Sequence, residues 1–170
     1  MKKAVLSFLS TACMLGILAT LSPVTQVAQA QYQTSFYNFS LHGSYAMQFT
    51  GTVFLPSPFD AYNGAFSRNG LVQFDGNGNF SANVIANYSG TISNDVFSGT
   101  YVVAPNGTFT LTVVNLPIPA IPSTIPNVFT FHGTIANGGN NALISLTGVS
   151  VGGAAQTNIG SVITGQLIRQ

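Results

Sequence analysis

Apolar and polar residues alternate with a period of two through nearly all of the chain after residue 40, with breaks at short clusters of Gly, Asn and Pro. This period puts successive side chains on opposite faces of an extended strand, and no stretch there sustains a helical period. The pattern predicts eight β-strands, at about residues 43–54, 64–74, 79–88, 95–103, 108–113, 127–135, 142–149 and 161–168. We therefore expect an all-β domain.

The breaks between the predicted strands have the composition of turns. The segment 75–78, Asp-Gly-Asn-Gly, predicts a tight hairpin between the second and third strands, and Pro105-Asn106-Gly107 predicts another between the fourth and fifth. The segment 116–126 contains four prolines. Because proline cannot donate a ladder hydrogen bond, this segment is expected to be a loop or an extended crossing.

Eight consecutive antiparallel strands can form an up-and-down barrel or a two-sheet sandwich. The barrel is favoured because several predicted strands carry an internal glycine, which suits a strand that bends or admits another group. Closure also removes the sheet edges that a weakly charged, β-rich chain could not otherwise protect. The β-sandwich remains the alternative. The internal glycines are Gly51, Gly70, Gly99, Gly133, Gly148 and Gly165.

The N-terminus has the three parts of a secretory signal peptide. Lys2 and Lys3 precede an apolar run over 4–21, and Ala28-Gln29-Ala30 is a small-residue cleavage site. The run contains polar residues and is soon followed by proline, so it is too short for a membrane span. We expect a signal peptide at 1–30, an N-terminal arm at 31–40, and a β-barrel domain at 41–170 that is secreted to the periplasm or the extracellular space, with no membrane span after cleavage.

Charge and cysteine content narrow the function classes. After residue 30 the chain has two arginines, three aspartates and no Lys, Glu or Cys, a formal charge of −1. Nucleic-acid binding depends on clusters of basic residues, so it is not expected. An exported domain without disulfide bonds is typical of a bacterial protein.

The composition also bears on partners and metals. A neutral polar surface gives little repulsion between copies, so self-association is a further expectation. Two isolated histidines supply no zinc site, and no metal or cofactor is expected.

Several segments resemble a group of small exported bacterial proteins of unknown function. These proteins are similar in outline to the allene oxide cyclase-like and dirigent-like barrels, of the calycin type. The resemblance implies a barrel with a central, mostly apolar cavity, and it brings in an isomerase or cyclase activity as one alternative. The segments that carry it are Leu41–Ala46, Val72–Asn79, Phe97–Val103 and Gly165–Gln170.

Two polar residues stand out as site candidates. Arg68 shares strand parity with the apolar face of its strand, and a guanidinium inside a barrel needs a partner or a ligand carboxylate. A bulge at 68–70 that turns Arg68 outward is the favoured interpretation, and an inward guanidinium that lines a ligand site is the alternative. His132 lies opposite the face of Phe129 and Phe131, where a surface position is the simpler interpretation. The residues predicted to line a ligand site are Tyr45, Phe66, Arg68, Tyr101, Phe131 and His132.

No set of residues supplies a reaction mechanism, so we expect a protein that is not an enzyme. The favoured function is a barrel that binds one small apolar ligand. A structural or surface-assembly protein is the second hypothesis, because the aromatic, Gln-rich arm could pair with a neighbour. An isomerase or cyclase that acts through cavity shape is the third.

Overall fold

The computed structural model describes residues 35–55, 57–119, 121–156 and 161–170. The predicted signal peptide and the start of the arm lie outside these residues. All eight predicted strands are present, together with a three-residue strand, β8. The fourth strand begins four residues earlier than predicted. The strands are β1 (His42–Val53), β2 (Gly64–Asp75), β3 (Asn79–Tyr88), β4 (Thr91–Val103), β5 (Thr108–Val114), β6 (Asn127–Ala136), β7 (Asn141–Val151), β8 (Ala154–Gln156) and β9 (Val162–Arg169).

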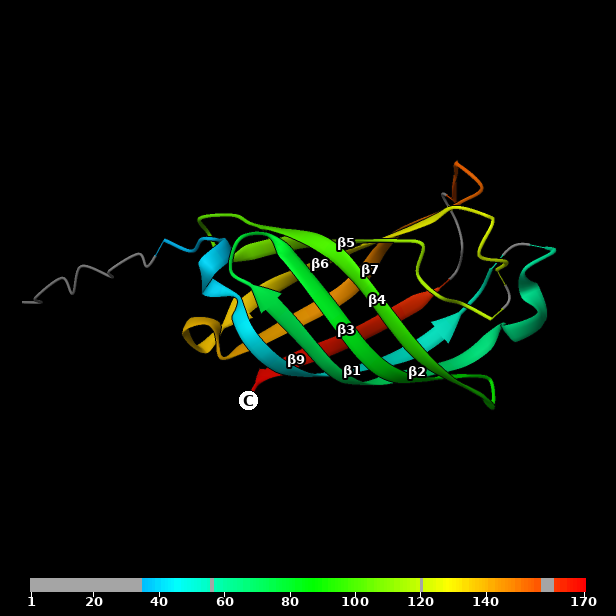
Figure 1. The fold of residues 1–170 in the computed structure, drawn as a ribbon, viewed down its shortest axis with the longest axis horizontal. Helices are drawn as coiled ribbons and strands as arrows, with labels where there is room; N and C mark the ends of the chain where they lie inside the picture. Colours follow the sequence, from blue (N-terminus) through cyan, green and yellow to red (C-terminus); the bar gives the residue numbers. More distant parts are fainter. Residues whose placement is uncertain (1–34, 56, 120, 157–160) are drawn as a thin grey trace, which may run out of the picture. The chain divides into compact units, whose positions relative to one another are not determined.

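The strands form a closed, all-antiparallel up-and-down barrel (Figure 1). Each strand from β1 to β7 pairs with the next along the chain, and β9 closes the sheet by pairing with both β7 and β1. The short strand β8 pairs with the last residues of β7. The predicted barrel is therefore confirmed, and the sandwich alternative is wrong, because every main strand has a partner on both sides.

Inward-facing side chains fill the barrel with aromatic and branched aliphatic groups. In β3, for example, buried positions alternate with more exposed ones along the whole strand. Burial of a large apolar side chain contributes about 1.5–3 kcal/mol, so this interior is the main source of stability in a chain without cysteine in its barrel. The buried aromatic residues are Tyr45, Phe49, Phe66, Phe74, Phe80, Tyr88, Tyr101, Phe109, Phe129 and Phe131.

At three of the internal glycines, a Cβ would clash with the ring of the inward-facing phenylalanine directly opposite on the adjacent strand. A Cβ built at Gly165 would lie 1.8 Å from Cδ1 of Phe49, which is far inside van der Waals contact. The rings therefore lie over the glycines and fill the space that a side chain would occupy there, as aromatic residues do in other curved sheets. The expectation that these glycines admit another group is met at three pairs, Phe49 with Gly165, Phe80 with Gly99, and Phe109 with Gly133.

The two ends of the barrel differ in their connections (Figure 1). One end, which we call the tight-turn end, carries the turns at 76–78, 104–107 and 137–140. The other, the long-loop end, carries the connections from β1 to β2, from β5 to β6 and from β7 to β8, with one short turn between β3 and β4. In Figure 1 the tight-turn end lies at the left and the long-loop end at the right.

The segment before β1 covers the tight-turn end. Phe36 donates its backbone N–H to the carbonyl of Pro105 at 3.2 Å, and Val103 donates to Oδ1 of Asn38 at 2.8 Å. The hydroxyl of Tyr101 lies 2.7 Å from the carbonyl of Leu41, which it can reach as a donor. The described part of the predicted arm therefore packs on its own barrel.

The hairpin predicted at 75–78 is present, with Asp75 as its organiser. Its Oδ1 accepts the backbone N–H groups of Asn77 and Asn79 at 2.7 and 2.9 Å, and its Oδ2 accepts the side-chain amide of Asn79 at 2.7 Å. These bonds, that of the Asn79 side chain first, hold the pKa of the Asp75 carboxyl below its ordinary value. This aspartate therefore has a structural task at the tight-turn end.

Candidate functional site

Arg68 points into the barrel from the middle of β2. It is 2% exposed, and its strand pairs with β1 and β3 in an unshifted register, opposite Phe49 and Ala86. The bulge considered for residues 68–70 is therefore wrong. Because strand parity is unbroken from Gly64 to Asp75, the guanidinium shares the inner face with Phe66 and must find its partners inside.

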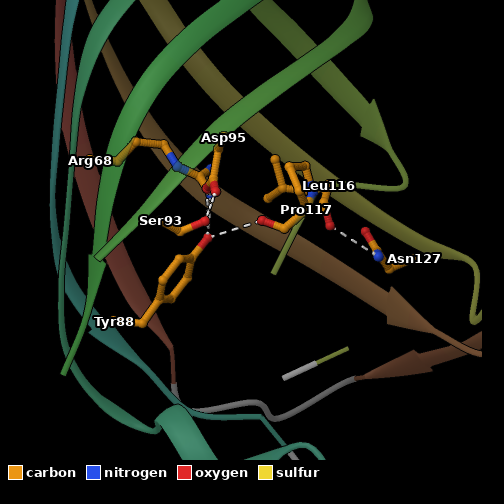
Figure 2. A network of polar contacts seen from close by, with 7 residues as sticks. All are labelled: Arg68, Tyr88, Ser93, Asp95, Leu116, Pro117 and Asn127. Atoms are coloured by element: carbon orange, nitrogen blue, oxygen red, sulfur yellow. Dashed lines mark hydrogen bonds and ion pairs between the residues drawn. The ribbon is translucent and has the colours of Figure 1, made fainter. Parts of the chain in front are cut away.

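The partner of Arg68 is Asp95 of β4, which is completely buried (Figure 2). Nη2 of Arg68 lies 2.6 Å from Oδ2 of Asp95. The other carboxylate oxygen accepts a hydrogen bond from the hydroxyl of Ser93, two residues before Asp95 in β4. Arg68 also donates to the hydroxyl of Tyr88 in β3. Adjacent strands thus bring a charged pair and two hydroxyl groups together inside the barrel.

Aromatic rings surround the guanidinium on several sides. Its central carbon lies 5.3 Å from the ring centre of Phe66, 5.2 Å from that of Phe97 and 5.9 Å from that of Tyr88. Rings at this range attract a cation, by about 2 kcal/mol where water is excluded. The Nε atom of Arg68 is nevertheless buried without a hydrogen-bond partner among the described residues. The ion pair is therefore held firmly but leaves the buried Nε–H group without an acceptor.

The hydroxyl of Tyr88 connects this charged pair to the long-loop end. It lies 3.0 Å from Oδ2 of Asp95 and 3.2 Å from the carbonyl of Pro117, so its single hydrogen can be donated to either acceptor (Figure 2). Burial raises the pKa of Tyr88 far above its ordinary value, which keeps the hydroxyl protonated at neutral pH. The tyrosine therefore acts as a neutral link between the ion pair and the loop 115–126.

A cavity of about 20 Å³ lies next to the ion pair at the long-loop end. This volume holds about one water molecule, so the interior of the barrel is almost completely packed. A second cavity, of about 10 Å³, lies deeper in the barrel, and Arg68 borders both. The first is lined by Phe49, Val53, Leu55, Phe66, Arg68, Tyr88, Leu116, Ile118, Phe129, Phe131, Leu146, Ser161 and Ile163.

A larger groove lies beside this cavity along the loop 115–126. Its volume is about 440 Å³, and its lining includes Ser93, Pro117 and Pro119. Leu116 and Ile118 line both the groove and the inner cavity, so these two side chains form the partition between them. The partition is fixed from behind by Asn127, whose side-chain amide donates to the carbonyl of Leu116 at 3.2 Å (Figure 2).

The structure brings together three of the six residues predicted to line a ligand site. Phe66, Arg68 and Phe131 all border the inner cavity. Tyr45 is buried at the tight-turn end, where its hydroxyl donates to the carbonyl of Gly139 at 2.6 Å. Tyr101 is buried at the same end, bonded to the N-terminal segment as described above.

His132 lies apart from the cavity, exposed on the outer surface of β6. It borders a hollow of about 520 Å³ whose other lining residues include four threonines of β5, β6 and β7. No carboxylate lines this hollow to orient the imidazole. Its position agrees with the simpler interpretation of this histidine as a surface residue.

Sequence reasoning missed Asp95, although the signal was present. The alternation in β4 places Asp95 on the same face as Phe97 and Tyr101, and strand parity alone, without the favoured bulge, places Arg68 on the inner face of β2. Two opposite charges on inward positions of a barrel imply an ion pair, because neither charge is stable there alone. The groove along 115–126 had no such signal, since it depends on how the loop folds back over the barrel.

Within the described residues, no helix has the length and hydrophobicity that a membrane crossing needs. Among solved structures, the chain is similar to one described as EF1p2_mFAP2b bound to DFHBI, with 15% sequence identity and a TM-score of 0.47, over 77% of this chain and 94% of that chain. No family model matches the sequence, and no curated protein matches it.

Proposed function

We propose that this protein is exported and that its barrel binds a small, mostly apolar ligand at the long-loop end. The observation that carries the proposal is the apolar cavity beside the Arg68–Asp95 pair, separated from a groove by Leu116 and Ile118. Ligand sites of this kind are mostly apolar, with a few polar groups that fix the orientation of the ligand. The segment 1–30, with its basic start and small-residue end, supports export.

Ligand binding requires the partition to move, because the closed cavity is close to the size of one water molecule. The loop 115–126 is well suited to this movement. It has no regular strand or helix in its described residues, and its prolines cannot join a β-ladder. Displacement of Leu116 and Ile118 would join the cavity to the groove and give space for a ligand of one or two rings.

The state of the polar groups favours binding over catalysis. The carboxylate of Asp95 already accepts hydrogen bonds from Arg68 and Ser93, and the hydroxyl of Tyr88 stays protonated. A general base must be free to take a proton from a substrate at the working pH. This pair of groups therefore supports a non-catalytic barrel rather than an isomerase.

Titration of the purified protein with Prodan, an uncharged naphthalene ketone whose fluorescence reports on polarity, tests the proposal. We expect saturable binding and a blue shift of the emission. In the variant Leu116→Ala the partition is thinner, so the affinity should rise. Leu41→Ala, a matched truncation at the tight-turn end, should leave the affinity unchanged. Absence of saturable binding to the wild-type protein, with binding only after truncation, would show that the cavity is merely a packing defect.

Self-association is a second candidate, favoured by one observation on the outer surface. Leu71 of β2, Ile85 of β3 and Val96 of β4 are exposed by 55%, 60% and 66%, on a face whose register brings them close together around Asn83. Sedimentation velocity over a range of concentrations tests it. A dimer that is lost in the variant Ile85→Asn would support assembly, and a monomer throughout would exclude it.

A further inference from the structure

We infer that the ligand is uncharged and carries a hydrogen-bond acceptor, such as a ketone or ester carbonyl, which Arg68 binds. This inference rests on the proposed function and names the chemical class that the same cavity selects. Three features of the cavity lead to it, namely an unused donor, a neutral charge balance and aromatic walls.

The unused donor belongs to the guanidinium of Arg68. Nη2 makes the hydrogen bonds to Asp95 and Tyr88, while Nε is buried without a partner among the described residues. A buried donor without an acceptor is unfavourable, and hydrogen bonds to charged groups are the stronger ones. A ligand acceptor beside Arg68 would satisfy this donor, which a plain hydrocarbon cannot do.

The charge balance then excludes an anionic acceptor. Arg68 and Asp95 are the charged side chains that are buried among the described residues, and they lie 2.6 Å apart. The other polar residues that line the cavity, Tyr88 and Ser161, are neutral. The site therefore has no net charge. A ligand carboxylate would bring an uncompensated negative charge next to Asp95 in a region of low dielectric constant, where such a charge is costly.

The walls of the cavity suit a flat apolar body. The rings of Phe49 and Phe131 are stacked, with centres 5.5 Å apart and an angle of 6° between their planes. Phe66 lines the same cavity, and its ring also lies close to the guanidinium. A planar ring system that carries a carbonyl could therefore contact the aromatic walls while its oxygen accepts from Arg68.

Three naphthalene compounds separate these features, because they share one ring system. Acetylnaphthalene has a neutral acceptor, naphthalene has none, and naphthoate has an anionic one. We expect wild-type protein, measured by calorimetric or fluorescence titration at neutral pH, to bind acetylnaphthalene about tenfold more tightly than naphthalene, as one hydrogen bond to a charged donor provides. Naphthoate should bind most weakly of the three.

Three variants test which groups cause this order. Asp95→Asn leaves the positive charge of Arg68 without compensation, so naphthoate should become the tightest ligand. The double variant Arg68→Met with Asp95→Leu removes the donor and both charges together, so it should bind acetylnaphthalene and naphthalene equally. Replacing both members of a buried ion pair by apolar residues often leaves the stability unchanged. The single variant Tyr88→Phe, which keeps both charges, should preserve the wild-type order.

The outcomes separate this inference from the function on which it rests. If the wild-type protein binds the three compounds with equal affinity, or prefers naphthoate, the inference is wrong while the proposed function stands. If none of them binds and Prodan does not bind either, the proposed function fails and the inference fails with it. The order measured on the wild-type protein is decisive even if Asp95→Asn does not fold.

Discussion

The two ends of this barrel differ in how their buried polar groups are hydrogen-bonded. At the tight-turn end, Tyr45 and Tyr101 are buried, and each hydroxyl is bonded to a backbone carbonyl of a nearby segment. At the long-loop end, Arg68 and Asp95 form an ion pair that leaves Nε of the arginine without a partner. The tyrosines stabilise the fold at little electrostatic cost, whereas a buried ion pair contributes little net stability.

This difference indicates where function is located. A barrel needs closed ends, and neutral hydroxyl groups on short, well-bonded turns are sufficient for that purpose. A charged pair beside an apolar cavity has no such structural need, and groups of this kind concentrate at functional sites. The following predictions test the comparison, beginning with the largest expected effect.

Removal of one charge at the long-loop end should have the largest effect. Asp95→Ala leaves Arg68 as an unpaired buried charge, so the free energy of unfolding should fall by about 3–5 kcal/mol. Urea unfolding followed by circular dichroism measures this change. The double variant Arg68→Met with Asp95→Leu serves as the control and should be close to the wild type or more stable. An equal loss in both variants would contradict the view that the pair is costly in itself.

Removal of a hydroxyl at the tight-turn end should have a smaller effect. Tyr101→Phe takes the donor from the carbonyls of Asn38 and Leu41, and we expect a loss of about 1–2 kcal/mol in unfolding free energy. Tyr37→Phe, at an exposed ring, is the matched control and should change nothing measurable. Prodan affinity should be the same in both variants. A weaker affinity in Tyr101→Phe would show that the two ends are coupled.

The smallest expected effect is on the pH dependence of stability, through the carboxyl group of Asp75 in the hairpin. Because its pKa is lower in the folded state than its ordinary value of 3.8, the carboxylate stabilises the fold above that value. The stabilisation is lost as the pH falls through the folded-state pKa. Melting temperatures measured between about pH 2 and pH 7 should therefore fall less steeply at acid pH in Asp75→Asn than in the wild type. Identical profiles would contradict this role of the carboxylate.

Most of the fold follows from the sequence, because the period of two fixes strand parity and Gly-rich segments fix the hairpins. The same parity indicates an inward side chain at Arg68 and at Asp95. The site is less predictable. Tyr45 and Tyr101 face inward with the same parity as Phe66, so parity alone does not separate them from the cavity residues. They lie at the tight-turn end, which the N-terminal segment covers, and the sequence of that segment has no periodic pattern that would predict its position. The partition made by Leu116 and Ile118 depends on a proline-rich loop whose path local sequence does not determine.

The central claim is that the long-loop end opens to bind a small apolar ligand while the tight-turn end stays closed. Backbone amide NMR spectra of the purified protein, recorded during titration with acetylnaphthalene, test it most directly. The account predicts saturable shifts in the loop 115–126 and around Arg68 and Ser93, with little change near Tyr45 and Tyr101. Shifts confined to the tight-turn end or the outer surface, or no saturable shift, would contradict it.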